Sequence, residues 1–205
     1  MANPIVEKAK ELKVGPAYDK TTGLGPVINA KHRESVVNWI EKGIEEGAKV
    51  VLDGRDTVVE GYENGFYLGP TILDHVKPGM TVGDREIFGP VLPVLLFDER
   101  DEAVRLINSR EHPLALYSFG LEKKAAEVVD ATLSGGACLN DTIMHIVNEA
   151  LPFGGVGNSG MGRYHGRESF DAFTHRRAVV STPTWADPPF RYMPYRMFRW
   201  VKKIL

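Results

Sequence analysis

The middle of the chain alternates between short apolar runs and amphipathic segments, which limits the fold more than any other feature. Apolar runs at residues 91–97, 115–119 and 137–140 have the length of strands. Two stretches with apolar residues at helical spacing separate these runs, one capped by Asp98 and one covering residues 121–133. A β-α-β-α-β order predicts parallel strands, right-handed crossovers and helices packed on the faces of the sheet. We therefore expect an α/β fold with a partly parallel sheet.

The first ninety residues predict further elements of the same kind. Residues 32–46 form an amphipathic helix in which Val36, Val37, Ile40 and Ile44 share one face, and Gly47 follows where a left-handed cap belongs. Other expected elements are a helix at residues 5–12, strands at 49–52, 71–76 and 176–181, and a helical turn at 168–173. We expect two parts, a partial domain at residues 1–175 and a strand with a tail at residues 176–205.

A Glu and a Phe come shortly before the apolar run at residues 91–97. Gly89 and Pro90 halt the chain there, and the run after them is typical of a strand buried on both faces. The Glu86 carboxylate can accept hydrogen bonds from a sugar diol, and the Phe88 ring can lie against a flat heterocycle. The alternative interpretation is an ordinary loop with one solvated Glu and one core Phe.

Residues 86–90 read E-I-F-G-P, which resembles a signature of the NAD(P)-dependent aldehyde dehydrogenases. Residues 24–28 (L-G-P-V-I), 69–73 (G-P-T-I-L) and 151–162 (L-P-F-G-G-V-G-N-S-G-M-G) resemble segments of this family in the same order. The resemblance extends from about residue 5 to residue 180. The front part is similar to methylmalonate-semialdehyde dehydrogenases, and the back part is similar to class 3 and coniferyl aldehyde dehydrogenases.

The resemblance implies roles for three side chains in a complete enzyme of this family. Glu86 would hold the nicotinamide ribose, Phe88 would position the nicotinamide ring, and Phe153 would line the tunnel by which the aldehyde enters. Phe153 also has a simpler interpretation as a core residue. The implied reaction is oxidation of an aldehyde to an acid or a thioester, with NAD or NADP as the cofactor.

The sequence offers no nucleophile for that reaction. Cys138 is the single cysteine and lies in an apolar run without a neighbouring His, Lys or Arg, so we interpret it as a structural residue. The family's catalytic Cys in its G-Q-x-C context, its general-base Glu, its oxyanion-hole Asn and its Gly-rich cofactor domain are all missing. The resemblance therefore implies a C-terminal portion that is inactive alone and binds a dinucleotide weakly or not at all. We assign no catalytic residue to this chain.

The glycine-rich segment at residues 155–160 matches G-x-G-x-x-G but lacks the context of a dinucleotide fingerprint. That fingerprint requires a buried strand before it and a helix after it, whereas Pro152 precedes this segment and no helix-forming run follows. We expect instead a tight loop whose backbone passes close to another segment or to substrate. The six His residues show no metal-ligand spacing, so we predict no metal site.

Charge is divided unevenly between the body and the end of the chain. The net charge is −2, but residues 188–205 carry five basic groups and no acidic one, which leaves 20 basic against 27 acidic groups elsewhere. An acidic body predicts no nucleic-acid partner. One cysteine and no apolar run of spanning length favour a cytoplasmic location.

Three hypotheses about the protein remain open at this stage. The chain is a fragment or half of a split aldehyde dehydrogenase, or a non-enzymatic oligomerisation module, or a membrane-associating piece. Residues 176–181 resemble the family's late strand, which adds to a neighbouring subunit's sheet, so the expected partners are a second copy or a complementary N-terminal half. Residues 195–205 predict an amphipathic helix, so residues 190–205 either dock on protein or contact a membrane surface.

Overall fold

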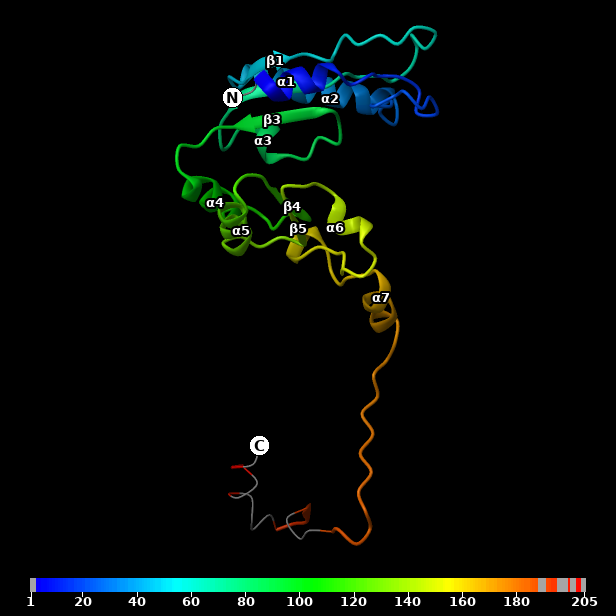
Figure 1. The fold of residues 1–205 in the computed structure, drawn as a ribbon, viewed down its shortest axis with the longest axis vertical. Helices are drawn as coiled ribbons and strands as arrows, with labels where there is room; N and C mark the ends of the chain where they lie inside the picture. The colour runs from blue at the N-terminus through cyan, green and yellow to red at the C-terminus, as the bar shows by residue number, and fades with distance from the viewer. Residues whose placement is uncertain (1–2, 188–190, 195–198, 200–201, 204–205) are drawn as a thin grey trace.

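The computed structural model describes residues 3–187, 191–194, 199 and 202–203, and it places most of them in two lobes (Figure 1). The first lobe runs from α1 to β3 and the second from α4 to α7. After α7 the chain leaves the second lobe as an extended segment (Figure 1). No helix in the described part of the chain combines the length and apolar character needed to cross a bilayer.

The first lobe is built on a three-stranded sheet with the order β1-β2-β3. The central strand β2 (Thr71–Val76) pairs antiparallel with β1 (Lys49–Leu52) and parallel with β3 (Val91–Leu95). Parallel neighbours need a crossover of a dozen or more residues. The segment between β2 and β3, which includes the short helix α3 (Thr81–Asp84), supplies it.

Helix α2 (Ala30–Glu45) covers this sheet, and its apolar face forms the core as its periodicity predicts. Val36 and Ile40 are fully buried in a cluster with Leu73 and Val82. Gly43 lets the helix approach closely, because a Cβ there would lie 2.7 Å from a methyl group of Val82. After the helix, Gly47 takes a φ of 105°, the left-handed conformation expected at a helix end. The helix α1 (Asn3–Lys10) precedes it.

The second lobe contains a smaller sheet of two parallel strands. β4 (Ala115–Ser118) pairs with β5 (Gly136–Leu139), and α5 (Glu122–Asp130) connects them and packs on both. This unit confirms the predicted strand-helix-strand order. The lobe also contains α4 (Arg100–Asn108), α6 (Met144–Val147), the 3₁₀ turn η1 (Gly157–Ser159) and α7 (Gly166–Ala172).

The α/β prediction is confirmed, but three details of residues 91–98 are wrong. β3 finds its parallel partner in β2, which precedes it, while β4 pairs with β5 in a separate sheet. Nor is β3 buried on both faces, since Leu92 is 45% exposed and nothing described covers its outer side. The cap of α4 is Glu99 rather than Asp98, and its side chain makes no capping hydrogen bond.

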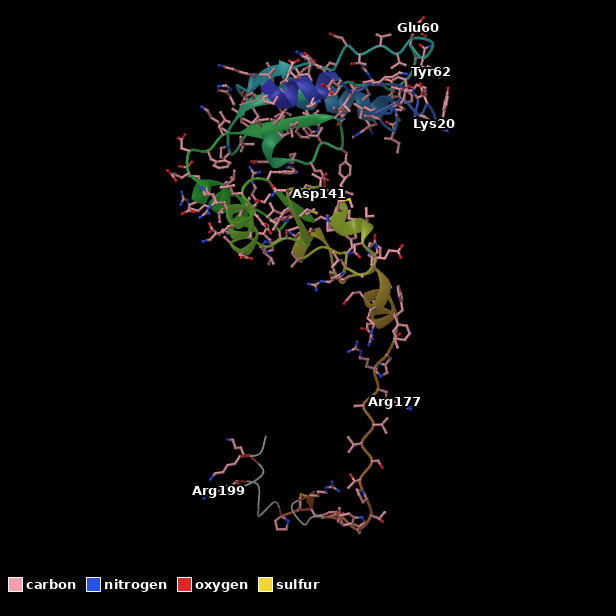
Figure 2. The ribbon with its side chains drawn as sticks, viewed as in Figure 1. Lys20, Glu60, Tyr62, Asp141, Arg177 and Arg199 are labelled. Atoms are coloured by element: carbon pink, nitrogen blue, oxygen red, sulfur yellow. The ribbon has the colours of Figure 1, made fainter. Side chains whose placement is uncertain are left out.

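The predicted pairing of residues 176–181 with a neighbouring subunit stays a prediction, and the helix predicted after them is described only in part. Residues 176–181 lie in the extended segment but pair with no strand among the described residues. Figure 2 shows Arg177 on this segment, away from both lobes. A strand needs a neighbour for its backbone hydrogen bonds, and the described chain offers none there. The amphipathic helix predicted at residues 195–205 lies largely outside the described residues.

Candidate functional site

The loop at residues 86–88 places one side chain in the core between two that face solvent. Ile87 is only 8% exposed and belongs to the core cluster of the first lobe. Glu86 is exposed, and Phe88 is 75% exposed, an unusual position for a large apolar ring. The alternative interpretation, an ordinary loop with a core Phe, is therefore wrong for Phe88, because its ring faces solvent. The buried Ile87 fixes the loop while the groups on either side remain available.

The backbone of Phe88 is held in an unusual conformation. Its φ is +53°, in the left-handed region that residues with a side chain rarely adopt, at a typical cost of about 1–3 kcal/mol. The Phe88 carbonyl oxygen lies 2.8 Å from His32 Nε2. Gly89 follows in close contact with α2, since a Cβ there would lie 2.7 Å from Val36 Cγ2. The loop therefore has a defined shape before any ligand binds.

The first turn of α2 organises this loop and its neighbours. Asn29 caps the helix, its side-chain oxygen accepting a hydrogen bond from the His32 backbone N–H at 2.8 Å. Arg33 donates from Nε to the Tyr67 carbonyl at 3.0 Å and from Nη2 to the Arg55 carbonyl at 2.8 Å. One helical turn thus fixes three separate loop segments.

An open cleft of about 840 Å³ lies beside Glu86, where the two lobes meet. Arg110 bridges the lobes there: its Nη1 donates to the Gly83 carbonyl at 2.7 Å, and its Nη2 contacts the Asp84 carboxylate. Glu86 lines the cleft, but Phe88 and Phe153 do not. The structure therefore does not bring the three predicted site residues into one cavity.

Phe153 lies in the second lobe, at the centre of a cluster of aromatic rings. Its backbone forms a two-way bridge with Tyr164, with N···O distances of 2.9 and 2.8 Å. The ring centroids of Tyr164, His145 and His165 lie 5.4, 5.7 and 5.9 Å from that of Phe153. The ring is half-buried, so this arrangement is compatible with either a packing role or a ligand wall.

Cys138 has a histidine neighbour, which the sequence analysis missed. Cys138 Sγ lies 3.4 Å from His145 Nδ1, and both side chains are buried. The expectation of no nearby His is therefore wrong, because α6 folds back onto β5 seven residues later. Gly136 makes room for this pair, since a Cβ there would lie 2.5 Å from His145 Cδ2. Cys138 is only 9% exposed, so its sulfur is largely shielded from solvent in this chain.

The glycine-rich segment is a tight loop, as predicted, and no phosphate-binding helix follows it. A Cβ at Gly154 would lie 2.2 Å from the Gly162 carbonyl oxygen, and one at Gly155 would lie 2.1 Å from that of Ser159. The next helix, α7, begins only at Gly166. These glycines therefore serve close backbone contact within the loop. Across the described residues, no three His, Cys, Asp or Glu side chains gather as metal ligands.

Comparison with known proteins agrees with the sequence motifs. A model of the aldehyde dehydrogenase family matches residues 1–179. A dimeric NADP-preferring aldehyde dehydrogenase from Canis lupus familiaris is 41% identical over 198 residues, which cover 94% of this chain and 42% of the canine protein. Family 3 members are also among the relatives, in agreement with the predicted class 3 resemblance.

Solved structures show the same similarity in three dimensions. A Mycobacterium tuberculosis aldehyde dehydrogenase complexed with NAD+ has a TM-score of 0.80 and 33% identity, covering 88% of this chain and 37% of that one. A methylmalonate-semialdehyde dehydrogenase from Oceanimonas doudoroffii has a TM-score of 0.78 and 32% identity, covering 89% of this chain and 38% of that one. The chain thus spans about two fifths of the length of these relatives. It belongs to the aldehyde dehydrogenase family.

Proposed function

We propose that this chain is the C-terminal portion of an NAD(P)-dependent aldehyde dehydrogenase and supplies cofactor and substrate positioning. The observation that carries the proposal is the loop at residues 86–88, in which the family signature presents Glu86 and Phe88 on either side of a buried Ile87. The aldehyde would be oxidised only in the complete enzyme.

The groups on this loop fit a nicotinamide nucleoside. No hydrogen bond or ion pair within residues 3–187 engages the Glu86 carboxylate, so it is free to accept two hydrogen bonds from a ribose diol. The exposed Phe88 ring offers a flat apolar surface of the size of a pyridine ring. When bound, the dinucleotide would accept a hydride, and the side chains named here would orient it.

The substrate side of the proposal rests on Phe153. The half-buried ring lies among Tyr164, His145 and His165, and the glycine-rich loop begins immediately after it. An apolar wall with a few polar groups is typical of small-molecule sites. An apolar wall of this kind selects among aldehydes mainly by shape.

The nucleophile must come from another segment. Cys138 is the single cysteine of the chain, and it is buried against His145. A thiol–imidazole pair can activate a nucleophile, but only where substrate can reach the sulfur. The complementary segment would also cover apolar side chains that the second lobe and β3 now expose, such as Leu92, Phe97 and Phe119.

The proposal is tested by complementation. The purified chain, alone and mixed with the upstream portion of a full-length relative, is assayed for reduction of NAD or NADP by a series of aldehydes. We expect activity only in the mixture, and Cys138→Ser should leave it unchanged. Glu86→Gln should weaken it roughly tenfold or more, while Glu111→Gln, a carboxylate in the same cleft, should not. Turnover by the chain alone would overturn the proposal.

A second role is suggested by residues 176–181. These residues are extended, Val180 is 88% exposed, and the backbone has no strand partner in the described chain. An exposed strand with apolar side chains can add to the edge of another sheet. We therefore propose that this segment joins two copies, and proline at residue 179 or 180 should convert the oligomer to a smaller species by light scattering. An unchanged mass would count against it.

A further inference from the structure

We propose that His32 is a positioning residue for the nicotinamide contact, because it holds the Phe88 backbone in the conformation that turns the ring outward. The inference concerns the single contact between His32 Nε2 and the Phe88 carbonyl oxygen, at 2.8 Å. Its consequence for catalysis rests on the proposed function, whereas its consequence for the loop does not.

The Phe88 backbone needs an external restraint. Its φ of +53° belongs to a region that an aromatic residue leaves unless something holds it there. Ile87 before it is anchored in the core, and Gly89 after it packs against Val36. These contacts fix the two ends of the turn, and the carbonyl between them is held by His32.

His32 is well placed to apply that restraint. It lies on the first turn of α2, where its own N–H is bound by the Asn29 side chain at 2.8 Å, so the ring projects from a capped helix and not from a mobile loop. A carbonyl oxygen only accepts hydrogen bonds, so Nε2 must carry the proton that is donated. Both the Nε2–H tautomer and the imidazolium can donate it, so the contact does not depend on the protonation state of the ring.

The two ligand groups of the loop should therefore depend on His32 to different degrees. Glu86 lies on the far side of the buried Ile87, so its carboxylate keeps its place when the Phe88 carbonyl is released. The Phe88 ring, however, turns with its own φ. Loss of the His32 contact should thus disturb the orientation of the nicotinamide ring more than binding of the ribose.

The loop is tested on the chain as it exists, by NMR of His32→Ala and His32→Gln. The Gln amide nitrogen is as many bonds from Cα as His Nε2, so it can donate to the same carbonyl. A backbone with positive φ gives a strong NOE between the amide and α protons of one residue. This NOE of Phe88 should weaken in His32→Ala and persist in His32→Gln and in Lys31→Ala, an exposed neighbour that serves as control. An unchanged Phe88 NOE in His32→Ala would overturn the proposal.

The catalytic consequence is tested in the complemented enzyme. His32→Ala should lower kcat by roughly tenfold while KM for the dinucleotide changes less than about threefold, and His32→Gln should restore kcat. Glu86→Gln should show the opposite split, with the main effect on KM. Equal changes in both parameters for His32→Ala would contradict a positioning role. If the wild-type mixture is inactive, the proposed function fails, but the NMR result still decides whether His32 holds Phe88.

Discussion

The two lobes differ in how completely they bury their apolar side chains. The first lobe has a core of eight buried residues from α2, β2, the α3 segment, the 86–90 loop and the residues just before β1 and β2. In the second lobe, Ala125 and Cys138 are the buried apolar residues among those described. The second lobe instead exposes large apolar residues along its strands and loops. They include Leu114, Phe119, Leu121, Leu133, Leu139, Ile143 and Val147.

This difference indicates that the first lobe can hold its own shape and the second needs a neighbour. Apolar area removed from water stabilises a fold by about 25 cal/mol per Å², so uncovered strands contribute little. Exposed apolar patches also mark surfaces that another chain segment covers. Glu86, Phe88 and His32 lie in the first lobe, whereas Phe153 lies in the second. If the proposed function holds, we therefore expect the cofactor-side geometry to be defined in this chain and the substrate side to be completed by a complementary segment.

The largest expected change in the free energy of unfolding comes from a comparison in which one apolar side chain is truncated in each lobe. Ile40→Ala in α2 should destabilise the chain by about 2–5 kcal/mol, because the fully buried side chain would leave a cavity. Ile107→Ala in α4 should cost about 1 kcal/mol, because this side chain is only partly buried. Urea unfolding followed by hydrogen exchange would measure both. Equal losses would contradict the contrast between the lobes.

The sequence predicted the elements of the first lobe well because their signals are local. The apolar face of α2, the glycine after it and the strand at residues 71–76 need only neighbours within a few positions. The pairing of β3 with β2 could not be read in this way, since it depends on which strand edge is free. The start of α4 was predicted one residue too early, because the sequence does not show whether an acidic side chain caps a helix or is only solvated.

The candidate site shows the same limit more sharply. The signature at residues 86–90 marked Glu86 and Phe88, but nothing local marks His32, which is 56 positions from the carbonyl it binds. The Cys138–His145 contact spans seven positions and could have been considered if α6 had been predicted. Motifs thus locate the groups that face a ligand, whereas the groups that hold them come from the tertiary fold.

A smaller change in stability is expected from a substitution at the junction of the two lobes. Arg110→Ala removes the hydrogen bond to the Gly83 carbonyl and the ion pair with Asp84, so the lobes should sample a wider range of relative orientations. Both partners are partly exposed, so the stability change should be about 1 kcal/mol or less. Small-angle X-ray scattering should show a larger radius of gyration, and Arg105→Ala, an exposed arginine of the preceding helix α4, should not. An identical radius in both variants would show that Arg110 does not set the orientation.

The smallest expected effect is a pH dependence of the ion pair at the point where the extended segment leaves the second lobe. Arg176 Nη2 lies 2.6 Å from an Asp171 carboxylate oxygen, and this contact, together with the charge of Arg167, lowers the pKa of Asp171 below its ordinary value of 3.8. A carboxyl group with a lowered pKa stabilises the folded contact at pH values above its ordinary pKa and ceases to do so as the pH falls through the lowered one. Amide exchange of Phe173 and Thr174, whose N–H groups donate to the Ser169 and Asp171 carbonyls, should therefore accelerate, relative to the intrinsic rates, as the pH falls below about 4. In Asp171→Asn, these amides should exchange at the faster relative rate at every pH, and the rate should no longer depend on pH. If the relative exchange of these amides in the wild-type chain is flat across this range, the ion pair does not hold the end of the second lobe in place.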